Sequence, residues 1–161
     1  MQIFIGADHR GFQLKRTITD HLISRGYPVT DIGTHAGGED CDYPPIAKKL
    51  AVSVVQTPGS RGILLCMTGI GHSIAANKVP GAYAALCYST ETALLSRQHN
   101  NANILVTGAR FVSASHIMEM IDAWLAAEFE GGRHLRRVEQ IKAIEREFSP
   151  DFRGSKEEGT L

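Results

Sequence analysis

The chain has 161 residues, enough for one domain with a substantial hydrophobic core and too few for two domains of ordinary size. Its 17 basic and 17 acidic residues balance, so the charge does not favour binding to nucleic acid or to a membrane surface. The first residues lack a secretion-signal pattern, and no segment approaches the roughly 18 apolar residues of a membrane span. These properties predict a cytoplasmic protein whose partners are small molecules or other proteins.

The chain contains three cysteines, Cys41, Cys66 and Cys87. Their number is odd and none is spaced as Cys-x-x-Cys, so the sequence supports neither a disulfide framework nor a zinc knuckle. We expect free thiols.

Short apolar runs rich in β-branched residues alternate with longer segments of helical periodicity. The runs span residues 3–6, 29–32, 62–67, 82–87 and 104–108. Continuous apolar strands separated by helices are typical of βαβ units, in which helices cover both faces of a parallel sheet. The pattern therefore predicts an α/β fold with about five parallel strands.

Helices are predicted between these strands, and local residue preferences mark several of their ends. The helical segments are 12–23, 45–55, 73–77, 89–98 and 113–129. Gly26 suits the end of the first helix, and Pro45 suits the first turn of the second. Ser113 can cap the last of them, and the glycines at positions 131 and 132 would end it.

After these glycines, residues 133–148 carry a narrow apolar stripe that is typical of a further helix. The stripe consists of Leu135, Val138, Ile141 and Phe148. It could pack on the chain's own sheet or on a second subunit. Residues 149–161 are polar and show no periodicity, so we expect one domain over 1–148 followed by a flexible tail over 149–161.

In open parallel sheets, ligands bind beyond the carboxyl ends of the strands, where the residues after each strand converge. The residues expected there are Asp8 and His9 after the first run, Cys66, Met67, Thr68, Gly69, Ile70 and Gly71 at the end of the third, and Arg110 after the fifth. His99 and Asn100 precede the fifth run, which places them at the opposite edge. Only a short helix or a dimer would bring them to the others.

Gly69 and Gly71 allow successive backbone N–H groups to turn toward one point, a geometry that stabilises negative charge. A dinucleotide fingerprint would require a small residue where Ile74 stands, and no Gly-Lys-Ser/Thr follows for a P-loop. We therefore expect an anion that develops during a reaction, such as an enediolate oxygen.

Each of these side chains also has a structural interpretation. Cys66 could lie close to a helix N-terminus, which would lower its pKa and prepare it to carry a proton near neutral pH, or it could be a buried packing residue. His99 could open a sugar ring as an acid or base, or it could stabilise the end of a helix. Thr68 could touch a ligand or only shape its loop, and Asp8 with His9 could form a turn or a helix cap.

Arg133 and Arg137 are four residues apart, so they share one face near the start of the predicted C-terminal helix. Together with His134 they add positive charge to the positive end of the helix dipole, which is unfavourable unless an anion neutralises it. Phosphate is the obvious candidate because its oxygens match the guanidinium group. Alternatively, these arginines could pair with surface glutamates such as Glu128 or Glu130.

Several sequence blocks together resemble the type B ribose-5-phosphate isomerase family, which also includes allose-6-phosphate and galactose-6-phosphate isomerases. The blocks are DHRGFQLK (8–15), DYP (42–44), GILLCMTGIGHSIAANK (62–78), SRQHNNAN (96–103) and DAWLAAEFEGGRHLRRV (122–138). The resemblance implies a Rossmann-like three-layer α/β/α fold whose C-terminal helix docks on a partner subunit. It also implies a homodimer or homotetramer with active sites shared between subunits, and no metal or organic cofactor.

By motif position, the resemblance implies that Cys66 is the base that moves a proton between C1 and C2, and that His99 opens the sugar ring. Thr68 and the backbone of Met67, Gly69, Ile70 and Gly71 would bind the enediolate. The other implied contacts, to sugar hydroxyls or phosphate, are Asp8, His9, Asn100, Arg110, Arg133 and Arg137.

The implied activity is conversion of ribose 5-phosphate to ribulose 5-phosphate, a step of the pentose phosphate pathway. Two residues depart from the family pattern: Met67 replaces a usual glycine, and His72 replaces a usual apolar residue. A bulkier Met67 could narrow the pocket, which suggests tetrose 4-phosphate as an alternative substrate beside allose 6-phosphate and galactose 6-phosphate. A non-catalytic phosphosugar-binding protein is the other alternative, and the presence of both Cys66 and His99 argues against it.

Overall fold

The computed structural model describes residues 1–35 and 40–148, and it contains a five-stranded parallel sheet. Its strands are β1 (Ile3–Ala7), β2 (Val29–Asp31), β3 (Arg61–Cys66), β4 (Ala84–Leu86) and β5 (Ile104–Gly108). They are arranged in the order β2-β1-β3-β5-β4, and every neighbouring pair is parallel. The prediction of about five parallel strands is confirmed.

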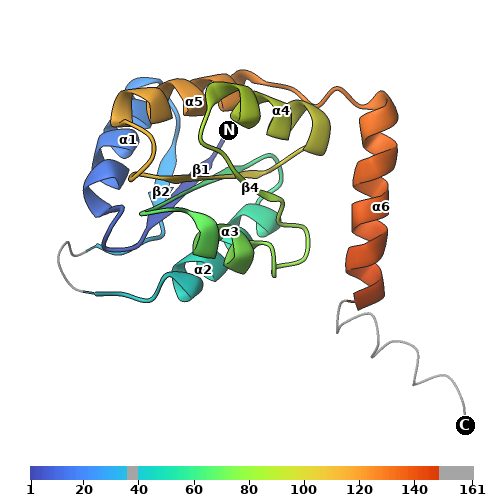
Figure 1. The fold of residues 1–161 in the computed structure, drawn as a ribbon, viewed down its shortest axis with the longest axis horizontal. Helices are drawn as coiled ribbons and strands as arrows, with labels where there is room; N and C mark the ends of the chain where they lie inside the picture. The colour runs from blue at the N-terminus through green and yellow to red at the C-terminus, as the bar shows by residue number, and fades with distance from the viewer. Residues whose placement is uncertain (36–39, 149–161) are drawn as a thin grey trace, which may run out of the picture.

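Helices cover both faces of this sheet, so the prediction of three α/β/α layers is also confirmed (Figure 1). One face carries α1 (Phe12–Ser24), α4 (Thr90–Asn100) and α5 (Ala114–Ala126), and the other carries α2 (Tyr43–Gln56) and α3 (Ile70–Ala76). The last helix, α6 (Gly132–Phe148), stands beside the layers and contacts α4. It therefore projects from the sandwich instead of forming part of a layer.

The central strands supply alternate side chains to two hydrophobic cores. Ile63 and Leu65 of β3 pack with α1 and α5, in a core that includes the fully buried Trp124. Leu64 points to the other face, where it packs in a core with Leu50 of α2. A strand that is buried on both sides must be apolar at every position, which explains the continuous apolar runs in the sequence.

Several predicted helix ends are confirmed at single residues. Ser113 is the N-cap of α5, and its hydroxyl accepts a hydrogen bond from the His116 amide. Gly26 follows α1 with a φ of +83°, a left-handed conformation in which a side chain would be strained. Pro45 lies in the first turn of α2, which begins at Tyr43.

Two helix boundaries differ from the prediction by three residues. α5 ends at Ala126 and does not continue to Phe129, because Ala127 is extended and the Glu130 amide bonds to the Gln98 carbonyl in α4. α3 begins at Ile70, earlier than Ser73, because the left-handed residue Gly69 ends the preceding loop. The docking of a loop onto a distant helix leaves no periodic signal in the sequence.

None of the described helices is both long enough and apolar enough to cross a membrane. The predicted tail, 149–161, lies outside the described residues, so the division into a domain and a tail stays a prediction.

Candidate active site

The strands β1 and β3 bring Asp8 and Cys66 to the same point at the carboxyl edge of the sheet. Ala7 and Leu65 are partners in these adjacent parallel strands, so the residues that follow them lie side by side. From here the chain enters α1 on one face and α3 on the other, which makes this a topological switch point. Such a point forms the crevice in which α/β proteins bind their ligands.

A cavity of about 540 Å³ opens at this switch point. Its lining residues are Asp8, His9, Arg10, Asp40, Cys41, Asp42, Cys66, Met67 and Thr68. Arg110 is joined to the same loop, because its amide donates a 3.1 Å hydrogen bond to the Met67 carbonyl. The structure thus brings together the predicted residues from the ends of β1, β3 and β5.

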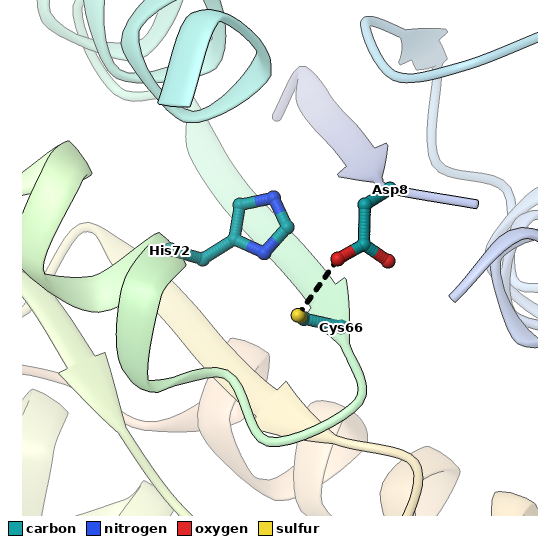
Figure 2. Close-up of side chains that lie close together, drawn as sticks. All are labelled: Asp8, Cys66 and His72. Carbon is teal, nitrogen blue, oxygen red and sulfur yellow. Dashed lines mark hydrogen bonds between the residues drawn. The ribbon is translucent and has the colours of Figure 1, made fainter. Parts of the chain in front are cut away.

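The thiol of Cys66 is hydrogen-bonded to the carboxylate of Asp8 (Figure 2). The sulfur donates to Oδ2 of Asp8 over 2.8 Å. Oδ1 of the same carboxylate accepts hydrogen bonds from the amides of Arg10, at 2.9 Å, and Gly11, at 3.0 Å. Asp8 is only 5 % exposed, so its carboxylate is held firmly against the sulfur. Cys66 itself is half-buried at the cavity wall and is not sealed in the core.

The predicted direction of the Cys66 pKa is wrong. Burial raises the pKa of this thiol, and the hydrogen bond and negative charge of Asp8 raise it further. Hydrogen bonds from the backbone of Gly69 and Thr68 act in the opposite direction and only partly offset these effects. The thiol is therefore mainly protonated near neutral pH, and Asp8 is the group placed to receive its proton.

The glycine loop after Cys66 adopts the conformation that the sequence predicts. Gly69 has a φ of +83°, and a Cβ atom there would lie 2.7 Å from the Leu86 side chain, so only glycine fits. The amides of Thr68 and Gly69 interact with the Cys66 sulfur. The hydroxyl of Thr68 accepts a 3.3 Å hydrogen bond from the Ile70 amide. Two N–H groups of the loop therefore face the position where a reacting atom beside the sulfur would lie.

His72 lies beside this pair and is completely buried (Figure 2). Neither of its ring nitrogens has a hydrogen-bond partner among the described residues, and its ring packs on Tyr43 at 5.6 Å between centroids. Burial lowers the pKa of His72 to about 4, although the negative charge of Asp8 opposes this shift. His72 is therefore a neutral imidazole at physiological pH.

His99 belongs to a second cluster, at the junction of α4 and α6. Its ring stacks on the ring of His134 with 4.1 Å between centroids and an interplanar angle of 7°. Both imidazoles approach the carboxylate of Glu130, at 3.8 and 3.7 Å, and Arg133 donates a 3.3 Å hydrogen bond to His134. Desolvation lowers the pKa of His134, and the neighbouring His99 and Arg133 lower it further.

This cluster lies at the opposite edge of the sheet from Cys66, as the sequence predicts. α4 runs back from the carboxyl end of β4 to the amino end of β5, so His99 in its last turn is carried away from the cavity. In the described part of the chain, no hydrogen bond, ion pair or ring contact joins His99 to the cavity residues. His99 also lies in the last turn of α4, where a positive charge stabilises the end of a helix, in agreement with its structural interpretation.

The other predicted residues near α6 lie in this region as well. Arg133 and Arg137 form no ion pair with any described glutamate, so the alternative of pairing with Glu128 or Glu130 is not seen. Asn100 lines a cavity of about 240 Å³ together with Ile141 of α6. The structure thus leaves the arginines available for an external anion.

Sequence reasoning missed the segment that closes the cavity on the side of β2. Asp40, Cys41 and Asp42 line it, and His9 contacts two of them: its Nδ1 accepts a 3.2 Å hydrogen bond from the Cys41 amide, and its Nε2 lies 3.2 Å from Asp40. This segment follows β2, so the rule of strand ends that selects Asp8 and Cys66 could have found it.

The same rule places Asp8 and Cys66 at one edge of the sheet, but it does not predict the hydrogen bond between them. The two residues are 58 positions apart, and this bond has no signal in the sequence.

Two groups of side chains carry donor atoms that a metal ion could use. They are Asp8, Cys66 and His72, and His99, Glu130 and His134; within each group the donor atoms lie within 4.8 Å of one another. Thiolate, imidazole and carboxylate are the ligands that zinc prefers. At the first group a metal ion would have to displace the Cys66 proton that Asp8 now accepts.

Comparison with known proteins points to one family. The sequence model described as Ribose/Galactose Isomerase matches residues 3–141. Ribose-5-phosphate isomerase B of Escherichia coli (strain K12) is 48 % identical over 144 residues, which cover 89 % of this chain and 96 % of that protein. D-erythrulose-4-phosphate isomerase of Pectobacterium atrosepticum is 46 % identical over 141 residues, which cover 88 % of this chain and 93 % of that protein.

The fold agrees with this match. The crystal structure of ribose-5-phosphate isomerase B from Mycoplasma genitalium, with bound ribulose 5-phosphate, has a TM-score of 0.88 and 44 % sequence identity to this chain. The similarity covers 91 % of this chain and 97 % of that one.

Proposed function

The chain belongs to the Ribose/Galactose Isomerase family, and we propose that it interconverts the aldose and ketose forms of a phosphorylated sugar, with ribose 5-phosphate and ribulose 5-phosphate as the default pair. The observation that carries the proposal is the Cys66 thiol, held 2.8 Å from a buried carboxylate and next to two loop amides in an open cavity. A proton carrier beside an oxyanion-binding loop is what isomerisation through an enediolate requires.

In the proposed reaction, Cys66 is the base. Its proton passes to Oδ2 of Asp8, and the resulting thiolate removes the proton from C2 of the aldose. In the enediolate the hydroxyl proton moves from O2 to O1, which leaves the negative charge on O2. The sulfur then delivers its proton to C1 as the carbonyl forms at C2, which gives the ketose, and Asp8 returns its own proton to the sulfur. The geometry supports this role for Asp8, because its other oxygen is already held by two amides and cannot turn away.

The amides of Thr68 and Gly69 would hold the negative oxygen of the enediolate. They already converge on the sulfur, which must lie against the reacting carbons. Fixed N–H donors of this kind stabilise charge as it develops. The scheme therefore needs no metal ion and no organic cofactor.

A second copy of the chain would complete the site. Support comes from α6, where Ile141, Ile144 and Phe148 recur at helical spacing and are 41 %, 58 % and 63 % exposed. Arg137 precedes this stripe by one turn and lies on the same side. An exposed apolar stripe next to charged groups is typical of a subunit interface. We therefore propose a homodimer in which α6 docks on its partner.

In this dimer, each α6 would carry its cluster to the cavity of the other chain. Arg133 and Arg137 would bind the substrate phosphate beside Arg110, and His99 would open the sugar ring next to the partner's Cys66. Asp8, His9 and Asn100 would contact the hydroxyls or the phosphate. The three free cysteines support a reducing, cytoplasmic location for the enzyme.

A four-carbon sugar phosphate is the second candidate substrate. Met67 lines the cavity and is 38 % exposed, so its side chain takes up space that a glycine would leave open. The Pectobacterium relative carries the name of an isomerase for a four-carbon substrate. Values of kcat/KM for four-, five- and six-carbon phosphates would decide, and Met67→Gly should shift the preference toward the longer sugars.

Solvent-proton exchange at C2 of ribose 5-phosphate tests the function itself. In D₂O, a catalyst that works through an enediol introduces deuterium and forms the ketose, whereas a phosphosugar-binding protein does neither. Cys66→Ala should lower kcat by about 10³-fold or more and leave substrate binding largely intact. Cys87→Ala, at a buried cysteine outside the cavity, is the matched control. Normal turnover by Cys66→Ala would show that another group is the base.

A further inference from the structure

A second polar cavity, of about 440 Å³, lies at the amino edge of the sheet, opposite Cys66. The start of β3 contributes Arg61, and the last turn of α4 contributes Arg97. Tyr83 comes from the segment before β4, and Lys142 and Arg146 come from α6. The cavity therefore collects cationic side chains from three separate elements.

Positive charge predominates in this cavity. The four cations face one lining carboxylate, that of Glu145. This carboxylate is already engaged: Oε1 accepts a 2.7 Å hydrogen bond from the Gly81 amide, and Oε2 accepts one of 3.5 Å from the Tyr83 hydroxyl. No ion pair joins Glu145 to Arg61, Arg97 or Arg146 among the described residues. Lys142 forms an ion pair with Glu139, at 2.8 Å, so the unneutralised positive charge of the lining lies on the three arginines.

Arg97 is the most constrained of these groups, because it is only 4 % exposed. Its Nη1 donates to the side chain of Asn101, at 2.9 Å, and to the carbonyl of Ala102, at 2.6 Å. Its Nε is buried and has no partner in the described part of the chain. Burial, together with repulsion from Arg61, lowers the pKa of Arg97 to about 10. A buried guanidinium with an unused donor and a cationic neighbour is unfavourable unless an anion lies between them.

We propose that this cavity is a binding site for an oxyanion, the phosphate or carboxylate group of a small metabolite, with Arg97 and Arg61 as its principal ligands. Guanidinium groups match the oxygens of both anions and bind them by charge-assisted hydrogen bonds. Arg146 and Lys142 would form the outer rim of the site. Nothing in the catalytic proposal uses these residues, so the site is additional to the one for the substrate phosphate.

The basic residues of the two proposed anion sites lie on different sides of α6. Lys142 and Arg146 are four residues apart and share one side of the helix, whereas Arg137, Ile141, Ile144 and Phe148 share another. A partner that docks on the apolar stripe therefore leaves the second cavity accessible. An anion bound there would brace α6 against the starts of β3 and β4, and would hold the helix that carries Arg137.

The test is a titration of the full-length protein followed by NMR of the arginine Nε–Hε groups. Inorganic phosphate and citrate are the two probes, so the experiment also distinguishes a phosphate site from a carboxylate site. An Arg137→Gln background weakens binding at the proposed substrate site. We expect the Arg97 signal to shift and to saturate with one of the two probes, and Arg61→Gln with Arg146→Gln should weaken that binding about tenfold or more.

Arg16→Gln, which removes an exposed positive charge on α1, is the matched control and should leave the affinity unchanged. Binding should also persist in Cys66→Ala, so the result is independent of whether Cys66 is the catalytic base. An Arg97 signal that does not respond to either anion would overturn the proposal. So would an affinity that falls equally in Arg16→Gln, because that result means unspecific charge attraction.

Discussion

At the scale of single residues, the site depends on how Asp8 holds Cys66. Two amides fix one oxygen of the carboxylate, and the other oxygen accepts the hydrogen bond from the thiol. A carboxylate in this position makes the thiol harder to ionise and at the same time gives its proton a place to go. In the proposed reaction, Cys66 thus works together with Asp8 as a pair.

Replacing Asp8 with Asn should separate these two effects. The pKa of Cys66 should fall, because the negative charge and its hydrogen bond raise that pKa in the native protein. Carboxymethylation of Cys66 at pH 7 to 8 should then speed up by about three- to fourfold for each unit that the pKa falls, because the larger thiolate fraction is partly offset by the lower nucleophilicity of the thiolate. At the same time kcat should drop, because Asn cannot accept the proton. Mass spectrometry of the Cys66 peptide measures the labelling. Slower labelling than in the native protein would contradict this view of Asp8.

His72 offers a second residue-scale prediction, because it is buried and neither ring nitrogen has a partner among the described residues. Its pKa is lowered from 6.5 to about 4 in the native protein. Between these pH values, His72 is therefore protonated in the unfolded chain and neutral in the native protein. The stability that depends on neutral His72 is fully present above pH 6.5 and is lost as the pH falls through about 4. This linkage amounts to about 3 kcal/mol between those limits.

His72→Met should therefore raise the free energy of unfolding by about 1 to 2 kcal/mol at pH 7, by removing unpaired polar atoms from the core. It should also flatten the loss of stability between pH 6.5 and 4. Urea denaturation at several pH values gives both quantities, and His35→Met, at a histidine whose side chain is 74 % exposed, is the control. A lower stability of His72→Met at pH 7 would mean that the imidazole has a partner.

At the scale of elements, α4 decides where His99 and Arg97 lie. A capping box fixes its start: the Ser89 hydroxyl accepts a hydrogen bond from the Thr92 amide, at 3.2 Å, and the Thr92 hydroxyl accepts one from the Ser89 amide, at 3.3 Å. The helix then runs to the amino edge of the sheet and ends at Asn100. Its cap therefore sets the register of Arg97 and His99, which lie two to three turns further along the helix.

Ser89→Ala should lower the free energy of unfolding by about 1 kcal/mol, since the Thr92 amide loses its acceptor. Ser89→Gly should lower the free energy of unfolding by only about 0.3 kcal/mol, because glycine is itself tolerated at an N-cap. Thermal unfolding of the two variants makes the comparison. Equal losses in both would indicate that the serine side chain does not cap α4.

At the scale of the whole molecule, the proposed catalytic groups lie at opposite edges of one sheet. The cavity with Cys66 is at the carboxyl edge, and the cluster with His99 and Arg133 is at the junction of α4 and α6. Figure 1 shows α6 at one side of the sandwich, where it is free to reach beyond its own chain. A single chain therefore holds the two halves of the proposed site without joining them.

Complementation between inactive variants tests the shared site. Cys66→Ala and Arg137→Ala should each be nearly inactive alone, because each lacks one half. After unfolding and refolding as an equal mixture, about a quarter of the native activity should return, since half of the dimers are mixed and each of these has one intact site. Refolding each variant alone is the control. If no activity returns while mixed dimers form, both residues act within one chain.

The sequence alone determined how strands and helices follow one another along the chain, and which residues lie at the carboxyl edge of the sheet. These features depend on local periodicity, caps and the rule of strand ends, which act over a few neighbouring residues. The position of His99 at the far edge also follows from its place before β5. Only the tertiary structure decided the strand order, the contact between Asp8 and Cys66, the raised pKa of that thiol and the basic cavity around Arg97. Desolvation and Coulomb interactions depend on neighbours that are distant in the chain, such as the 58 residues between Asp8 and Cys66, and a linear sequence does not show which of them meet.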